Sequence, residues 1–307
     1  MATPRKCLVD PNVPLFYHLV SRCVQSAYLY GNDPLTGQDC SHRKQQLIDR
    51  LKFLVAYFAV DLYGYSIMDN HFHLALYHDP KAHLRWSASE VADRWLAVSP
   101  PRSWKEQEVT PEMFATTKQA LLEDPKRLLH VRRQLGSMST FMKFLKQGIA
   151  RRANMERGTS GHFFEARFWS GALVSERAIL SCMAYIDLNP VRAEIVQSVE
   201  DIRHSGIRDR LLEAEADPAS LEAYLKPLGG GLPEEPPRLG MTLKGYAELL
   251  EGLAKPAAAA PDGSFDEQWR RHVAGFRHRQ RAYGSREDIE RFAKALGWKR
   301  LPRAQTK

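Results

Sequence analysis

Residues 62–77 contain two apolar, β-rich stretches, 62–68 and 72–77, on either side of the turn-forming run Met68-Asp69-Asn70. This pattern predicts a β-hairpin. His71 and His73 lie at the start of its second strand. Side chains two positions apart on a strand project from the same face, so these two imidazoles can chelate one metal ion. The hairpin therefore requires a fold with a sheet, and that sheet carries a candidate metal site beside a loop.

The patterns on either side of the hairpin predict alternating strands and helices. Strands are predicted over 16–22 and 168–174, and helices over 41–60, 137–154 and 175–188, the last of which ends at Asn189-Pro190. Strand, helix, hairpin, helix and strand in this order indicate an α+β fold with a ferredoxin-like antiparallel sheet. Residues 79–136 are predicted to form a mostly helical insertion in it.

Four sequence blocks in a fixed order, within about residues 14–205, resemble one known family. The blocks are Phe16-Tyr17-His18-Leu19-Val20-Ser21-Arg22, Met68-Asp69-Asn70-His71-Phe72-His73-Leu74, Gly161-His162-Phe163-Phe164-Glu165-Ala166-Arg167-Phe168 and Tyr185-Ile186-Asp187-Leu188-Asn189-Pro190-Val191-Arg192-Ala193. They resemble the REP-associated tyrosine transposases, which are relatives of the single-tyrosine HUH insertion-sequence transposases. The resemblance implies a ferredoxin-like core and cleavage of single-stranded DNA by a tyrosine.

The resemblance also implies a divalent metal ion on His71 and His73. In HUH sites a third ligand comes from the helix that carries the tyrosine. Here that helix offers Asn154, which aligns with an asparagine of the family, and Gln147. Neutral oxygen donors of this kind complete the shell of a hard ion, so the expected cofactor is Mg²⁺ or Mn²⁺.

The nucleophile departs from the family pattern. The resemblance places the catalytic tyrosine on the helix before the Gly161-His162 block, but Ile149 and Arg152 occupy the two tyrosine places here. No tyrosine occurs between Tyr77 and Tyr185. Isoleucine has no oxygen that could attack a phosphodiester. The nucleophile would then be a metal-activated water or a tyrosine from elsewhere, for which Tyr185 is the nearest candidate in the sequence.

Positive charge is concentrated in two regions. Residues 126–168 carry ten Lys and Arg against two acidic residues, and residues 264–307 carry twelve against five, whereas 213–263 is acidic. Clustered Lys and Arg are typical of phosphate binding, although a solvated helix face gives the same pattern. The predicted DNA-binding residues, two of them on the family's third block and one on its fourth, are Lys143, Lys146, Arg151, Arg152, His162, Arg167 and Arg192.

Composition predicts a globular protein with one main domain. The chain has 307 residues, 44% of them hydrophobic and 26% charged, and lacks both an 18-residue apolar run and a signal-like start. These features favour a cytoplasmic protein without membrane spans. The predicted units are a transposase-like domain over 1–210, an acidic connector over 211–263 and a basic helical tail over 264–307. The four cysteines lack a Cys-x-x-Cys pair, which favours reduced thiols.

Three functional classes fit these observations. The first is a transposase-like protein that binds single-stranded or hairpin DNA and either retains metal-dependent strand cleavage or has lost it. The second is a non-catalytic, domesticated DNA-binding module used in regulation or repair, which the missing helix tyrosine favours. The third is a hydrolase of another phosphoester, supported only by the His71–His73 pair. The family includes monomers and dimers, so no oligomeric state follows.

Overall fold

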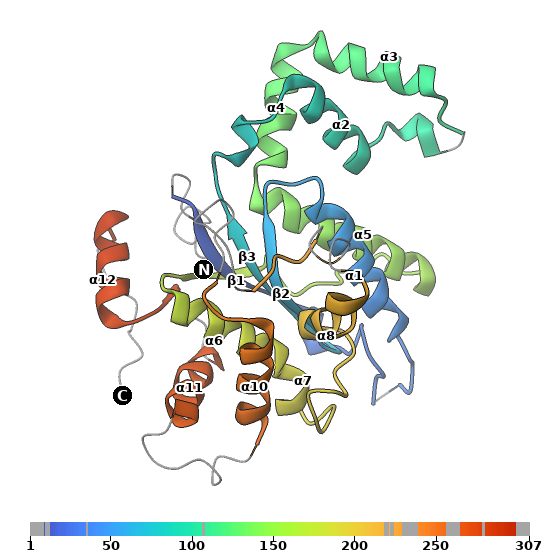
Figure 1. Ribbon diagram of the computed structural model, residues 1–307. Coiled ribbons are helices and arrows are strands. Elements are labelled where there is room, and N and C mark those ends of the chain that lie inside the picture. Colours follow the sequence, from blue (N-terminus) through green and yellow to red (C-terminus); the bar gives the residue numbers. More distant parts are fainter. Residues whose placement is uncertain are drawn as a thin grey trace.

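The computed structural model describes residues 9, 13–34, 36–105, 108–217, 221, 224–228, 239–255, 265–277 and 280–298. Its centre is a five-stranded sheet with the order β2-β3-β1-β4-β5 (Figure 1). The strands are β1 (Leu15–Arg22), β2 (Asp61–Ile67), β3 (His71–His78), β4 (Trp169–Leu173) and β5 (Ala282–Tyr283). Neighbouring strands from β2 to β4 are antiparallel, whereas β5 runs parallel to β4. The predicted α+β class is confirmed, but the sheet is mixed and not purely antiparallel.

Helices cover both faces of this sheet (Figure 1). Their bounds are α1 (His42–Val55), α2 (Ala88–Val98), α3 (Pro111–Leu122), α4 (Pro125–Leu135), α5 (Met138–Arg157), α6 (Glu176–Asp187), α7 (Asn189–Arg192), α8 (Gly206–Ala216), α10 (Leu243–Ala254), α11 (Phe265–Ala274) and α12 (Arg286–Ala295). Capping residues set the ends of α5: the Ser137 hydroxyl accepts from Thr140 N, and Gly158 ends the helix at φ 60°. Gly is favoured at that position because it has no Cβ to oppose a left-handed backbone.

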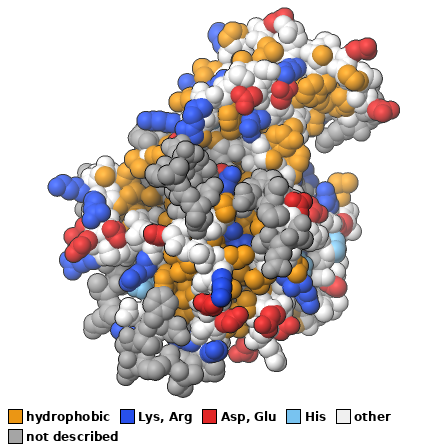
Figure 2. Space-filling model, in the orientation of Figure 1, with side chains coloured by type: hydrophobic (Ala, Val, Ile, Leu, Met, Phe, Trp, Pro, Cys, Tyr) orange, Lys and Arg blue, Asp and Glu red, His pale blue; other side chains and the backbone are white. Residues whose placement is uncertain are grey.

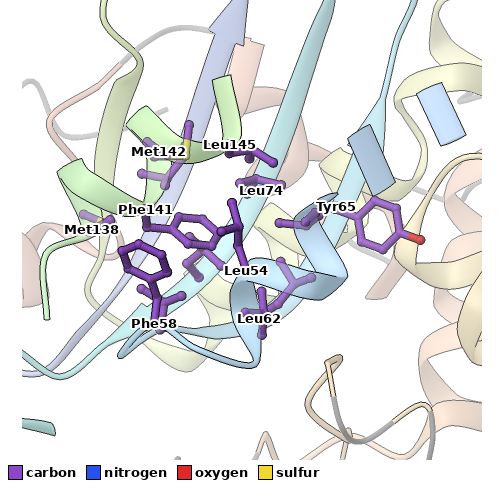
Figure 3. Close-up of a cluster of buried hydrophobic side chains, with 14 of the residues drawn as sticks. Leu54, Phe58, Leu62, Tyr65, Leu74, Met138, Phe141, Met142 and Leu145 are labelled. Carbon is purple, nitrogen blue, oxygen red and sulfur yellow. The ribbon is translucent and has the colours of Figure 1, made fainter. Parts of the chain in front are cut away.

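The two faces of the sheet bury different side chains, as strand alternation requires. Phe72, Leu74 and Leu76 of β3 belong to a core that also contains buried side chains of α1 and α5. Figure 3 shows part of this core, where Phe141 and Leu145 of α5 lie beside Leu74. The opposite face of β3, with Ala75 and Tyr77, packs in a second core against α6, α10 and α11. The helices α5 and α6 therefore lie on opposite sides of the sheet.

Within residues 79–136 the helices α2, α3 and α4 form a lobe whose buried side chains continue the core of α1 and α5. In this lobe α2 packs against α3 and α4. Figure 2 shows the lobe projecting at the top of the molecule, with Lys and Arg side chains interspersed among Asp and Glu. The Ser87 side chain and the Glu90 carboxylate form a capping box at the start of α2. The lobe follows the last residue of β3, His78, whereas His71 is the first residue of that strand.

The last part of the chain adds to the main body. Helices α10 and α11 pack on α6, and α11 leads into the short strand β5. Ala172 N donates to Arg281 O over 2.9 Å and Val174 N donates to Tyr283 O over 3.0 Å, which extends the sheet beyond β4. The tail was expected to be helical, and α11 and α12 are, but the strand between them was not predicted. Its two residues are too few to show alternation.

Candidate metal and tyrosine site

His71 and His73 project from the same face of β3, as the predicted alternation requires. The pair register of β1 with β3 sets Arg22 opposite His71 and Val20 opposite His73. The two imidazole centroids lie 4.8 Å apart, with their planes at 78°. His73 is buried and His71 is half-buried, so the pair reaches from the core to the surface. The hairpin turn that precedes them is closed by a hydrogen bond from Met68 N to His71 O of 2.8 Å.

Hydrogen bonds fix the proton of His71. Asn70 Nδ2 donates to Ser26 O over 3.1 Å, which turns the Asn70 Oδ1 atom toward His71 Nδ1, 2.6 Å away. An amide oxygen can only accept, so Nδ1 of His71 carries the proton. The lone pair of the His71 imidazole is therefore on Nε2.

His73 has the same tautomer. Its Nε2 lies 2.9 Å from Asn189 Nδ2, and its Nδ1 lies 2.9 Å from Nε2 of His18. Because the amide N–H of Asn189 donates, Nε2 of His73 holds the lone pair and Nδ1–H donates to His18. Metal-binding histidines usually give their second N–H to an acceptor in this way, which fixes the ring. Both histidines of the pair are thus oriented by a neighbouring side chain.

His18 lies behind the pair, on the neighbouring strand β1. It is buried, and aromatic rings surround it: the centroids of Trp169, Phe276 and Tyr283 lie 5.5, 5.7 and 6.4 Å from that of His18. Phe276 and Tyr283 come from the C-terminal segment, and their rings stack at 4.1 Å. This aromatic wall, Trp169 with Phe276 and Tyr283, shields the His18–His73 hydrogen bond from water.

Three side chains of α6 and α7 extend the cluster around the histidines. The Tyr185 ring lies edge-on to His73, with centroids 5.6 Å apart, and the Arg192 guanidinium carbon lies 5.6 Å from the Tyr185 ring centroid. Tyr185, Asn189 and Arg192 follow the i, i+4, i+7 spacing of one helical face. The helix α6 ends at Asp187, Leu188 caps it, and α7 begins at Asn189, with Pro190 in its first turn. The Asn189 amide thus lies beside His73.

The end of α6 is held in place by a buried carboxylate. Asp187 accepts a hydrogen bond from the Tyr246 hydroxyl of α10 over 2.7 Å and one from Ile207 N of α8 over 3.2 Å. Burial raises the pKa of Asp187 to about 6, although the hydrogen bond from Tyr246 and the charge of Arg210 act against this rise. The position of Tyr185, two residues earlier, therefore depends on α8 and α10.

The donor chemistry of this cluster fits a divalent metal ion. Within the described part of the chain, no group of three or more His, Cys, Asp or Glu side chains could hold one. The residues that would hold one are His71 and His73, through Nε2, and Asn189, whose side chain would have to turn so that Oδ1 replaces the Nδ2 atom that now lies on His73. Two imidazoles with a neutral oxygen leave coordination positions for water or phosphate oxygen, as Mg²⁺ or Mn²⁺ requires. Asn189 was not among the predicted ligands.

The predicted residues of α5 lie on the other side of the sheet. Ile149 is 2% exposed and belongs to the core of α1 and α5, together with Phe72 and Leu74. Asn154 donates from Nδ2 to Gly161 O over 2.9 Å, and Gln147 lines a pocket between α5 and the 161–168 loop. The amide that the structure brings to His73 is Asn189, and the tyrosine that it brings there is Tyr185.

The predicted DNA-binding residues fall into three groups. Four of them line the pocket between α5 and the 161–168 loop, namely Lys143, Lys146, His162 and Arg167. Arg151 and Arg152 are exposed on α5 and do not line that pocket. Arg192 stands beside Tyr185. Of these seven predicted residues, Arg192 is therefore the one that lies beside Tyr185, on the layer of the sheet opposite α5.

Three site residues were within reach of the sequence. Asn189 and Tyr185 are four positions apart on either side of a helix end, a spacing that sets them on one face. His18 belongs to a quoted block and alternates correctly with Val20 and Arg22 on its strand. The aromatic wall from Phe276 and Tyr283 had no such signal, because a segment distant in sequence supplies it.

Two further features concern the cysteines and the helices. Cys23, Cys40 and Cys182 are free and buried, and Cys7 lies outside the described residues. A search of the described residues finds no helix that is both long and apolar enough to span a membrane.

Comparison with known proteins gives a match to one solved structure. No protein-family model and no curated protein sequence matches this chain. A solved structure of a REP-associated tyrosine transposase bound to a REP hairpin aligns with 70% of this chain and 87% of its own. The TM-score is 0.40 and the sequence identity is 11%.

Proposed function

We propose that this protein binds single-stranded or hairpin DNA and cleaves it with Tyr185 as the nucleophile, in a reaction of the HUH transposase type. The observation that carries the proposal is the position of Tyr185 edge-on to His73, with Asn189 hydrogen-bonded to the same imidazole. A tyrosine, a metal-binding histidine pair and an arginine within one small cluster are the groups that covalent phosphoryl transfer needs.

In the proposed cleavage, Tyr185 is the nucleophile and Arg192 binds the phosphate. The phenol oxygen of Tyr185 attacks the phosphorus, the bond from phosphorus to the leaving sugar oxygen breaks, the phenolic proton passes to water and the leaving oxygen takes up a proton. Arg192, 5.6 Å from the Tyr185 ring, binds a phosphate oxygen by charge-assisted hydrogen bonds. His71, His73 and Asn189 would hold Mg²⁺ or Mn²⁺, which supplies polarisation of the phosphodiester.

The strand order supports this assignment. The sequence β1-α1-β2-β3-α5-β4 with the order β2-β3-β1-β4 corresponds to the split βαβ arrangement of ferredoxin-like folds. In it the two central strands are β3 and β1, which carry His71, His73 and His18. The histidines are thus held on rigid backbone. The substrate class, single-stranded or hairpin DNA, rests on the family resemblance and the basic segments.

The experiment is a covalent trapping assay with Tyr185→Phe as the main variant. Wild-type protein and labelled hairpin DNA are incubated with Mn²⁺, then separated under denaturing conditions, and the attached peptide is identified by mass spectrometry. The expected adduct is on Tyr185, and Tyr185→Phe should abolish it while DNA binding persists. Tyr57→Phe, at a half-buried tyrosine that adjoins Phe53 and not the histidines, is the matched control.

Each other outcome would contradict this mechanism in a different way. Cleaved DNA without an adduct, unchanged in Tyr185→Phe, would assign the attack to water. An adduct on another tyrosine would contradict the role of Tyr185. Tight binding without any product under Mg²⁺ or Mn²⁺ would contradict cleavage and leave the non-catalytic DNA-binding module as the function.

A further inference from the structure

A pocket of about 510 Å³ lies between α5 and the loop 161–168, away from the histidine pair. Its volume falls in the range of roughly 300–1,000 Å³ that is usual for small-ligand sites. The apolar part of its lining comes from both elements and consists of Met142, Ala150, Phe163, Phe164 and Phe168. An apolar cleft of this size accommodates one planar ring system.

The rim of the pocket is cationic. Lys143, Lys146, His162 and Arg167 line it together with the apolar residues, and its lining includes no Asp or Glu among the described residues. The Lys146 ammonium donates to Ala166 O over 2.7 Å and lies 4.5 Å from the Phe164 ring centroid, so it is fixed in the wall. Lys143 and Arg167 are exposed, and neither forms an ion pair within the described residues. Their charges are directed to solvent.

The pocket lies beside the end of β1, the strand that pairs with β3. Val24 N donates to Phe163 O over 3.0 Å, and Glu165 N donates to Arg22 O over 3.1 Å. Arg22 is in turn the register partner of His71. The loop therefore lies along the end of β1. A DNA strand bound at the histidines can pass round this end of the sheet to the pocket.

We propose that this pocket binds one unpaired base of a DNA strand, with the base in the apolar cleft and the neighbouring phosphates on Lys143 and Arg167. Apolar and aromatic surface beside cations is the combination that single-strand binding uses, since each base has an apolar face and each phosphate a charge. A duplex cannot supply the base without unpairing it. The site therefore selects unpaired DNA, which deepens the proposed function and rests on its DNA ligand.

The test compares two oligonucleotides that differ only in their bases. One is fluorescein-labelled oligothymidylate, and the other is an abasic deoxyribose-phosphate strand of equal length and charge. Binding is measured by anisotropy in the Tyr185→Phe background, which cannot form the proposed adduct. The parent protein should bind the base-bearing strand about tenfold more tightly, in line with the usual contribution of one stacked base.

Two kinds of variant separate the cleft from its rim. Ala150→Leu fills the cleft without a change of charge and should remove the preference for bases, whereas Ala120→Leu on the exposed face of α3 should not. Lys143→Ala with Arg167→Ala should weaken binding of both strands and flatten its salt dependence by about one unit of slope for each phosphate that the variant no longer binds. Circular dichroism melting confirms that each variant folds.

The outcomes distinguish this proposal from the proposed function. If Ala150→Leu keeps the full preference for bases, the pocket is not the base site, whatever the cleavage assay gives. If the preference is lost in Ala150→Leu but wild-type protein forms no adduct, the base site stands and covalent cleavage alone fails. If neither strand binds at low salt, both proposals fail.

Discussion

Asn189 Nδ2 and His73 Nε2 are joined by a hydrogen bond of 2.9 Å, so an amide from the start of α7 lies directly on the lone pair of a buried histidine of β3. The amide has an oxygen as well as a nitrogen, and rotation of the side chain exchanges them. The same residue can therefore satisfy the imidazole or provide an oxygen ligand beside it.

Replacement of Asn189 by Asp should strengthen binding of divalent ions, and replacement by Ala should weaken it. A carboxylate adds a negative, hard oxygen beside the two imidazoles, whereas alanine removes the third donor. Mn²⁺ titration followed by electron paramagnetic resonance measures both. Equal Mn²⁺ affinities in wild type, Asn189→Asp and Asn189→Ala would show that Asn189 is not a ligand.

His18→Phe should lower Mn²⁺ affinity by about 10–100-fold, the usual effect of losing an outer partner of a metal-binding histidine. Phenylalanine keeps a ring among Trp169, Phe276 and Tyr283 but cannot accept the Nδ1–H of His73. The melting temperature serves as the control for packing. Unaltered Mn²⁺ affinity in a folded His18→Phe protein would remove His18 from the site.

Ile149→Tyr should destabilise the fold and restore no DNA adduct. The larger side chain must enter a core in which Ile149 is 2% exposed, and overpacking costs roughly 1–3 kcal/mol. Its hydroxyl would face the core of α1 and α5, which is across the sheet from His71. Urea unfolding measures the loss, with Arg152→Tyr at an exposed position of α5 as the matched control. A peptide from Ile149→Tyr that carries nucleotides on residue 149 would contradict the geometry.

The stability that Asp187 contributes should fall as pH rises from about 4 to about 6. Burial raises the pKa of Asp187 in the folded protein from 3.8 to about 6, so in this range the folded chain binds more protons than the unfolded chain. By linkage the free energy of unfolding then decreases with pH, by roughly 3 kcal/mol at most, and is constant above the folded pKa. Urea unfolding of wild type and Asp187→Asn between pH 4 and 7 isolates this contribution as the difference of two curves. A difference independent of pH would mean that Asp187 titrates normally.

Arg151→Ala with Arg152→Ala should weaken DNA binding and reduce its salt dependence by up to about two units of slope, one for each phosphate that these side chains bind. Both side chains are exposed on α5 in a basic part of the chain. Anisotropy titrations from low to moderate salt give the slope. Affinity at low salt equal to that of wild type would assign both arginines to a solvated helix face.

Strand alternation predicted which residues of β3 share a face, because that pattern is local. It gave the juxtaposition of His71 with His73. In the helix that precedes the Gly161-His162 block, Met138, Phe141, Met142, Leu145 and Ile149 recur at helical spacing, which is typical of a buried stripe, but a stripe does not say which face of the sheet the helix covers. The sequence showed that this helix lacks the family's tyrosine and named Tyr185 as the nearest candidate, and Tyr185, on the opposite layer, is the tyrosine beside His73.

Because β5 lies near the end of the chain, the aromatic wall is completed late in synthesis. His18, His73 and Tyr185 leave the ribosome well before Phe276 and Tyr283, and until those arrive β4 is an open sheet edge. Closing this edge joins segments far apart in the chain, which is a slow, non-local step of folding. A chain synthesised only as far as α10 thus lacks Phe276 and Tyr283, two of the three rings of the aromatic wall beside His18.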